Sequence, residues 1–161
     1  MKRHTKLLAA SIVLCGSITA NAGELATKGN YSGVFGWYAV GRSVQVNPDV
    51  VVWTGEFSGV FHNAVKGGPF DSAGVSCPGI NEIDKGVSTS HGRCLLVDGE
   101  GHTASIVWRC GGAFPTCDGT WQWTGGTGKY AGIHGENTMN CRFVTPAATH
   151  GECVWKGSWQ R

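Results

Sequence analysis

The stretch VVWTGEFSGVF, residues 51–61, alternates apolar and polar side chains with a period of two. Val51, Trp53, Phe57 and Phe61 fall on one side of the alternation, and the other side is mostly polar. A β-strand places successive side chains on opposite faces, so this pattern is typical of a strand with one face in a core and one in water. It favours an antiparallel sheet, because such sheets are commonly covered on one face only.

The same alternation recurs along the chain, without a sustained helical period. It predicts strands over residues 93–97, 103–109, 120–124, 135–143 and 152–160, and an earlier pair over 33–40 and 42–46 that is broken at 47–49. Short strands joined by glycine-rich turns, with 26 Gly in 161 residues, are typical of an all-β sandwich or barrel. We expect a small antiparallel β-barrel of about eight strands with little helix, because closure removes exposed strand edges.

Residues 67–91 interrupt the pattern. Gly67-Gly68-Pro69, Cys77-Pro78-Gly79 and Lys85-Gly86 break any regular element there. We therefore expect a long connection with one short strand or helical turn around residues 81–84. A loop of this length is uncommon in a compact domain, so the segment is either functional or hides a further strand.

The first 22 residues have the features of an export signal: a basic start, an apolar run and the small-residue site Ala20-Asn21-Ala22. We expect cleavage after Ala22, one barrel domain over residues 23–161, and a periplasmic or extracellular location. No second stretch is apolar and long enough for a transmembrane helix, so we expect no integral membrane segment after cleavage. The remaining chain carries ten basic and eleven acidic residues, which argues against nucleic acid as a partner.

The cleaved chain keeps six cysteines, and an even number in an exported protein indicates disulfides. Six cysteines allow 15 connectivities. Pairing of neighbours along the chain fits the expected hairpins and predicts three bridges: Cys77–Cys94, Cys110–Cys117 and Cys141–Cys153. No Cys-x-x-Cys spacing is present, so the cysteines do not indicate a zinc site.

The sequence TGGTGKYAGI at residues 124–133, together with VWKGSW at 154–159, resembles a group of uncharacterised secreted bacterial proteins. The glycine-rich turn is similar to one found in small barrels of the allene oxide cyclase and dirigent type. The resemblance is specific over about the last 70 residues, weaker from Tyr31 to Cys77 and silent about Gly67 to His91. It implies a lipocalin-like antiparallel barrel. No catalytic residue of allene oxide cyclase matches a position here, and fold alone does not fix function.

Large aromatic residues on one face of several strands give the strongest indication of function. Six of them are our candidate ligand-binding residues: Trp53, Phe57, Trp108, Trp121, Trp123 and Trp155. These rings either fill the barrel as core or wall a cavity for one small apolar or aromatic molecule. A third interpretation turns the pairs Trp121/Trp123 or Trp155/Trp159 outward as a platform for sugars or a partner protein.

Catalytic and cofactor signals are weaker. His134 and Glu136 share a strand face and form the one acid/base pair that a cofactor-independent isomerase or cyclase could use. Asp98, Glu100 and His102 could hold a metal from one side of a hairpin, but polar residues beside a turn are usually only solvated, so we expect no metal. The glycine-rich run lacks the helix that a dinucleotide loop requires, and we expect no cofactor. The sequence thus predicts noncovalent binding of a small apolar molecule, with an isomerase and a cell-envelope interaction module as alternatives.

Overall fold

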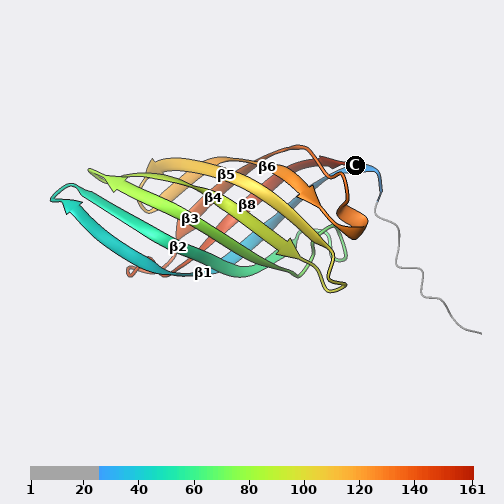
Figure 1. Ribbon diagram of the computed structural model, residues 1–161, viewed down its shortest axis with the longest axis horizontal. Coiled ribbons are helices and arrows are strands. Elements are labelled where there is room, and N and C mark those ends of the chain that lie inside the picture. Colours follow the sequence, from blue (N-terminus) through green and yellow to red (C-terminus); the bar gives the residue numbers. More distant parts are fainter. Residues whose placement is uncertain (1–25) are drawn as a thin grey trace, which may run out of the picture.

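The computed structural model describes residues 26–161, and the expected export signal lies outside that range. Eight antiparallel strands pair in chain order and close into one barrel (Figure 1). The strands are β1 (Lys28–Asn47), β2 (Val50–Asn63), β3 (Ala73–Asp84), β4 (Val87–Val97), β5 (Thr103–Ala113), β6 (Thr116–Gly126), β7 (Glu136–Phe143) and β8 (His150–Gln160). A single 3₁₀ turn, Gly128–Tyr130, precedes β7 in the described range. The expected eight-strand barrel is confirmed.

The interpretation of residues 67–91 as a long connection is wrong. Strand β3 begins at Ala73, β4 begins at Val87, and the two form a hairpin around Lys85 and Gly86. Three inward-facing residues near this turn, Asn81, Ser88 and Ser90, are buried and polar. Polar side chains on both faces remove the apolar alternation by which a strand is recognised.

The expected pair of strands over residues 33–40 and 42–46 is also wrong, because both segments belong to the 20-residue strand β1. Gly41 does not form a turn. It is the cross-strand neighbour of Gly55 in β2, and the Trp53 ring lies close to both glycines. Gly41 therefore makes room for the Trp53 ring and does not bend the chain.

All three expected disulfides are confirmed. Cys77–Cys94 joins β3 to β4, Cys110–Cys117 joins β5 to β6, and Cys141–Cys153 joins β7 to β8. Each bridge therefore links the two strands of one hairpin.

The barrel interior is filled by aromatic rings over much of its length. Trp121, Trp155 and Phe61 are at most 2% exposed, and Tyr31 packs against Phe61 and Trp121. Tyr31 donates a hydrogen bond of 2.9 Å to the buried Asn137 Oδ1. Burial raises the pKa of the Tyr31 hydroxyl, so that hydroxyl stays protonated and acts as the donor.

Glycines on neighbouring strands make room for these rings. Gly79 and Gly92 are cross-strand partners in β3 and β4, and a methyl group added at either would come within 2.7 Å of the Trp108 ring. The same close approach of aromatic rings to glycine recurs along the barrel wall. The high glycine content thus reflects the size of the rings inside the barrel as well as its turns.

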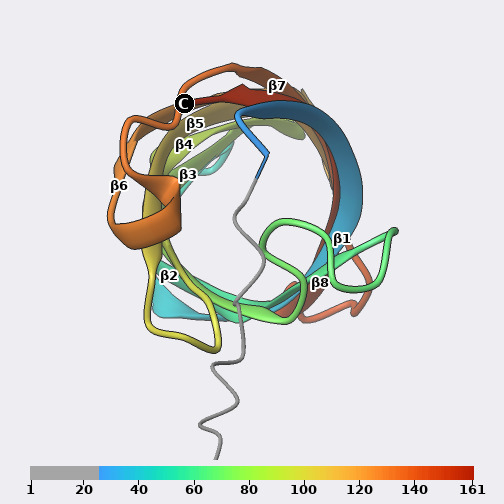
Figure 2. The same ribbon diagram turned by 90° about the vertical axis from the view of Figure 1, so that its right-hand side faces the viewer.

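At the end of the barrel that carries the C-terminus, the loop between β2 and β3 turns in over part of the opening (Figure 2). The β2–β3 loop lies across this end and inserts Phe70, which is 2% exposed and stacks on Tyr130 at 4.0 Å and Trp123 at 4.9 Å between ring centroids. Tyr130 comes from the glycine-rich run before β7, in which Gly128 and Gly132 have positive φ values of 57° and 78°. The run forms a tight turn that places Tyr130 over this end of the barrel. Its positive-φ glycines thus have the turn role expected from the sequence.

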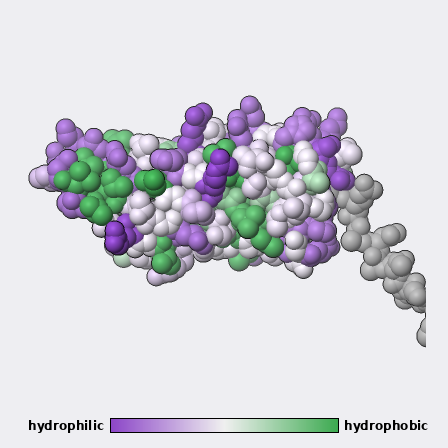
Figure 3. Space-filling model, in the orientation of Figure 1, coloured by the Kyte–Doolittle hydropathy of each residue, from purple (hydrophilic) through white to green (hydrophobic). Residues whose placement is uncertain are grey.

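The opposite end has an uneven rim. There the β1–β2 hairpin extends beyond the other strands of the barrel (Figure 1). Pairing of β1 with β8 ends at Tyr38 and His150, whereas β1 stays paired with β2 as far as Asn47. Figure 3 shows an apolar patch around the tip of this hairpin, where Val44 and Val46 are more than half exposed. No helical segment of residues 26–161 has the length and apolar character of a membrane span.

Candidate functional site at the open end

A cavity of about 290 Å³ lies at the open end of the barrel. Its walls come from the extended half of β1, from β2 and β3, and from the β5–β6 and β7–β8 turns. The lining residues are Ala39, Gly41, Ser43, Val51, Trp53, Phe57, Asn81, Ile83, Phe114, Phe143, Ala147, Ala148 and Thr149. None of them carries a charge, so the lining is mainly apolar.

Trp53 is held in the wall by the glycines opposite it. Gly41 and Gly55 face each other across β1 and β2, and a methyl group at either would come within 2.5 Å of the Trp53 ring. The ring therefore lies against bare backbone. On the cavity side, Trp53 contacts Phe57 at 4.7 Å between centroids.

The aromatic contacts continue around the cavity floor. Phe57 meets Trp37 at 4.9 Å, and Trp37 meets Phe143 at 5.1 Å, both edge to face. Phe143 then contacts Phe114 in the β5–β6 turn at 5.4 Å. Such pairs prefer this tilted geometry because the positive ring edge faces the negative ring face. Trp53, Phe57, Phe114 and Phe143 line the cavity, and Trp37 connects two of them from behind without lining it.

A smaller void of about 50 Å³ lies deeper in the barrel and shares Phe57 and Phe143 with the open cavity. All six disulfide cysteines line it, together with Met139 and several aromatic residues, including Trp108 and Trp155. The three disulfides therefore surround this void, below the open cavity. The indole N–H groups of Trp108 and Trp155 have no hydrogen-bond partner among the described residues.

The structure divides the six candidate ligand-binding residues among three environments. Trp53 and Phe57 line the open cavity; Trp108 and Trp155, again with Phe57, line the deeper void. Trp121 and Trp123 line neither, and pack against each other and against Tyr31. The outward-facing interpretation of the Trp pairs is wrong, because Trp121, Trp123, Trp155 and Trp159 are all at most 7% exposed.

Sequence reasoning missed a buried polar group of which Asn81 lines the open cavity and Ser90 lines the deeper void. Asn81, Ser88 and Ser90 face inward from β3 and β4, and both serine hydroxyls donate hydrogen bonds of 2.7 Å to Asn81 Oδ1. The spacing of Ser88 and Ser90 two residues apart was the available signal, because it puts two hydroxyls on one strand face. Trp37, Phe114 and Phe143 were also missed; Phe114 lies in the turn between β5 and β6 and belongs to no alternating strand.

The proposed acid/base pair of an isomerase does not lie in the barrel. His134 and Glu136 are both exposed. The His134 ring contacts the backbone carbonyl of Gly132 at 2.9 Å from Nδ1. The pair therefore cannot act on a molecule bound inside the barrel.

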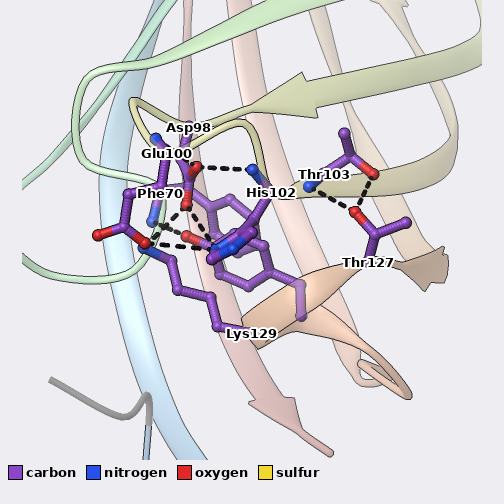
Figure 4. Close-up of polar contacts among 8 residues, drawn as sticks. Phe70, Asp98, Glu100, His102, Thr103, Thr127 and Lys129 are labelled. Atoms are coloured by element: carbon purple, nitrogen blue, oxygen red, sulfur yellow. Dashed lines mark hydrogen bonds and ion pairs between the residues drawn. The ribbon is translucent and has the colours of Figure 1, made fainter. Parts of the chain in front are cut away.

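Asp98, Glu100 and His102 do come together, at the β4–β5 turn beside Phe70 and Lys129 (Figure 4). Their ligand atoms lie within 4.8 Å of one another. The ammonium of Lys129 sits between the two carboxylates, 2.8 Å from Asp98 Oδ2 and 3.0 Å from Glu100 Oε2. The positive charge that a metal would supply thus comes from Lys129, and the cluster is an ion-pair group.

Asp98 also organises the β4–β5 turn. Its Oδ1 accepts hydrogen bonds of 2.9 Å from the backbone N–H groups of Glu100 and His102. Burial by itself would raise the pKa of Asp98, but the hydrogen bonds from Lys129 and from these backbone groups outweigh it and lower that pKa. Lys129 has a raised pKa for the complementary reason: its hydrogen bonds to Asp98 and Glu100 outweigh burial.

Comparison with known proteins finds no matching family model and no matching curated protein. Among solved structures, the chain is similar to the pterocarpan synthase dirigent protein GePTS1, with 17% identity over 97% of this chain and 98% of that chain and a TM-score of 0.44. It is also similar to the pterocarpan synthase dirigent protein PsPTS1, with 14% identity over 83% of this chain and 95% of that chain and a TM-score of 0.46. The resemblance to secreted bacterial proteins stays a prediction.

Proposed function

We propose that this protein binds a small, largely apolar molecule reversibly in the open end of its barrel. The observation that carries the proposal is the cavity of about 290 Å³, walled by Trp53, Phe57, Phe114 and Phe143. An apolar cavity of ~150 Å³ holds benzene, so this one has room for an aromatic molecule of one or two rings. The size also approaches that of ordinary ligand pockets.

The character of the wall supports binding in place of catalysis. The lining contains no carboxylate, ammonium, guanidinium or imidazole group, which are the usual general acids and bases. Its hydroxyls are on Ser43 and Thr149; Thr149 Oγ1 lies 3.0 Å from Nδ1 of His150, but His150 itself does not line the cavity. The apolar surface and the aromatic rings are suited to removing a hydrophobic molecule from water.

A cavity-filling variant tests the proposal. Val51 and Val52 are neighbours in β2; Val51 lines the cavity, and Val52 is on the opposite face of the strand. We expect Val51→Trp to weaken binding of one- and two-ring aromatic compounds at least tenfold, because the new ring takes their space. Val52→Trp should leave binding unchanged.

Binding is measured by ligand-observed NMR and by native mass spectrometry of the oxidised protein before and after extraction with organic solvent. A bound molecule that is lost on extraction, and is absent from Val51→Trp, supports the proposal. If the wild-type protein and Val51→Trp retain or lose every compound equally, the cavity is not the binding site.

We also propose that the protein works outside the cytoplasm. Three disulfides lie in the barrel interior, and disulfides persist in oxidising compartments. Cell fractionation with N-terminal sequencing tests this: we expect the mature chain to begin at Gly23 and to be absent from the cytoplasm. A chain with an intact N-terminus found in the cytoplasm would contradict the proposal.

A further inference from the structure

Asn81 is the buried polar side chain in the cavity wall. It is 5% exposed and lies in β3, opposite Trp53 of β2 on one side and Ser90 of β4 on the other. Ser88 and Ser90, which are 2% and 6% exposed, each donate a hydrogen bond of 2.7 Å to its Oδ1. A carbonyl oxygen has two lone pairs, so the two serines occupy both and fix the orientation of the amide.

The other half of the amide is unused. Asn81 Nδ2 carries two N–H donors, and neither has a hydrogen-bond partner among residues 26–161. Nδ2 is not one of the fully buried side-chain atoms without a partner, so it is accessible from the cavity, where water or a ligand can accept its hydrogen bonds. Because Asn81 also lines the open cavity, a molecule in that cavity is in a position to supply the missing acceptor.

We propose that Asn81 Nδ2 donates a hydrogen bond to an oxygen of the bound molecule, and that the cavity selects uncharged one- or two-ring compounds bearing a carbonyl, ether or phenol oxygen. The inference rests on the proposed function of the open cavity and specifies its ligand. Pure hydrocarbons bind less well, since they leave the amide donor unpaired. Carboxylates bind poorly, since no cationic side chain lines the cavity and a buried charge requires a partner.

The test compares two ligands of nearly equal shape, indane and indanone, which differ by one carbonyl oxygen. We expect the wild-type protein to bind indanone about tenfold more tightly than indane, the ratio typical of one hydrogen bond. Isothermal titration calorimetry and ligand-observed NMR measure both affinities. Asn81→Leu should remove the preference by weakening indanone about tenfold while leaving indane unchanged or tighter.

Two further variants separate recognition by Asn81 from a general effect of polarity. Thr89→Ala removes an exposed hydroxyl from the outer face of β4, between Ser88 and Ser90, and it should keep the tenfold preference. The double variant Ser88→Ala/Ser90→Ala keeps Asn81 but frees its amide to rotate, and should reduce the preference to a fewfold. This double variant decides the question where Asn81→Leu fails to fold, as judged by near-UV circular dichroism.

The outcomes distinguish the two proposals. If both compounds bind the wild-type protein equally, and neither the Asn81 variant nor the double serine variant changes their ratio, the cavity binds ligands but Asn81 does not select them, and the inference is overturned. If neither compound binds at millimolar concentration, the proposed function fails along with it. A preference for indanone that is lost in Asn81→Leu and kept in Thr89→Ala supports the inference.

Discussion

Phe70 gives the sharpest test of how the β2–β3 loop packs on the barrel. Its ring is 2% exposed and stacks on Tyr130 and Trp123, so Phe70→Ala should lower the free energy of unfolding by about 3–5 kcal/mol, the range for a large ring removed from a core. Phe70 also has a φ of 60°, a left-handed conformation that costs a residue with a side chain about 1–2 kcal/mol. Phe70→Gly relieves that cost and should be about 1 kcal/mol less destabilising than Phe70→Ala.

Urea-induced unfolding with the disulfides intact, followed by Trp fluorescence and by circular dichroism, measures both differences. Val65→Ala in the same loop is the control, because Val65 is 70% exposed and its truncation should change the free energy of unfolding by less than about 0.5 kcal/mol. A loss below about 1 kcal/mol for Phe70→Ala would refute the idea that this loop plugs the barrel. A greater loss for Phe70→Gly than for Phe70→Ala would refute the argument from backbone conformation.

Three further outcomes follow from contacts elsewhere in the barrel, and urea unfolding measures each. Tyr31→Phe removes the donor to the buried Asn137 Oδ1 and should cost about 1–3 kcal/mol, the cost of an unpaired buried acceptor; a loss near zero would mean that water takes over the bond. Gly92→Ala places a methyl group within 2.7 Å of an indole ring and should cost about 1–3 kcal/mol through overpacking, so a neutral effect would contradict the close packing of rings on glycine. Because the pKa of Asp98 is lowered in the folded state, its ion pair with Lys129 stabilises the protein above the ordinary Asp pKa of about 3.9, and that stability is lost as the pH falls through the folded pKa. The stability difference between the wild-type protein and Asp98→Asn should therefore be constant from neutral pH to about pH 4 and shrink below it, and a difference that stays constant under acid would contradict this.

The sequence alone was sufficient for the fold class and the disulfides. Alternation places Ile106 and Trp108 on one strand face, and both are buried. Hairpins with short connections bring cysteines that are neighbours along the chain onto neighbouring strands, and so the pairing followed from strand order. These features depend on local periodicity, which a single sequence carries.

The candidate site was less predictable, because it departs from the pattern that identifies a strand. Asn81 and Ser88 face the barrel interior but are polar, so the β3–β4 hairpin looked like a loop. Phe114 contributes from a turn, and no periodicity assigns a turn residue to a wall. Trp53 lines a cavity, whereas Trp121 fills the core. This difference depends on how the barrel packs around each ring, and strand patterns do not contain that information.

The placement of the disulfides within hairpins has a consequence for how the cylinder comes together. Each bridge spans a short segment of chain, with separations of 17, 7 and 12 residues, so it can form as soon as its own hairpin has folded in an oxidising environment. Strand β1 meets β8 through backbone hydrogen bonds, and none of the three bridges crosses that seam. Oxidation therefore links the strands in pairs, one hairpin at a time. Closure of the barrel, by pairing of β1 with β8, stays noncovalent and reversible even in the fully oxidised protein.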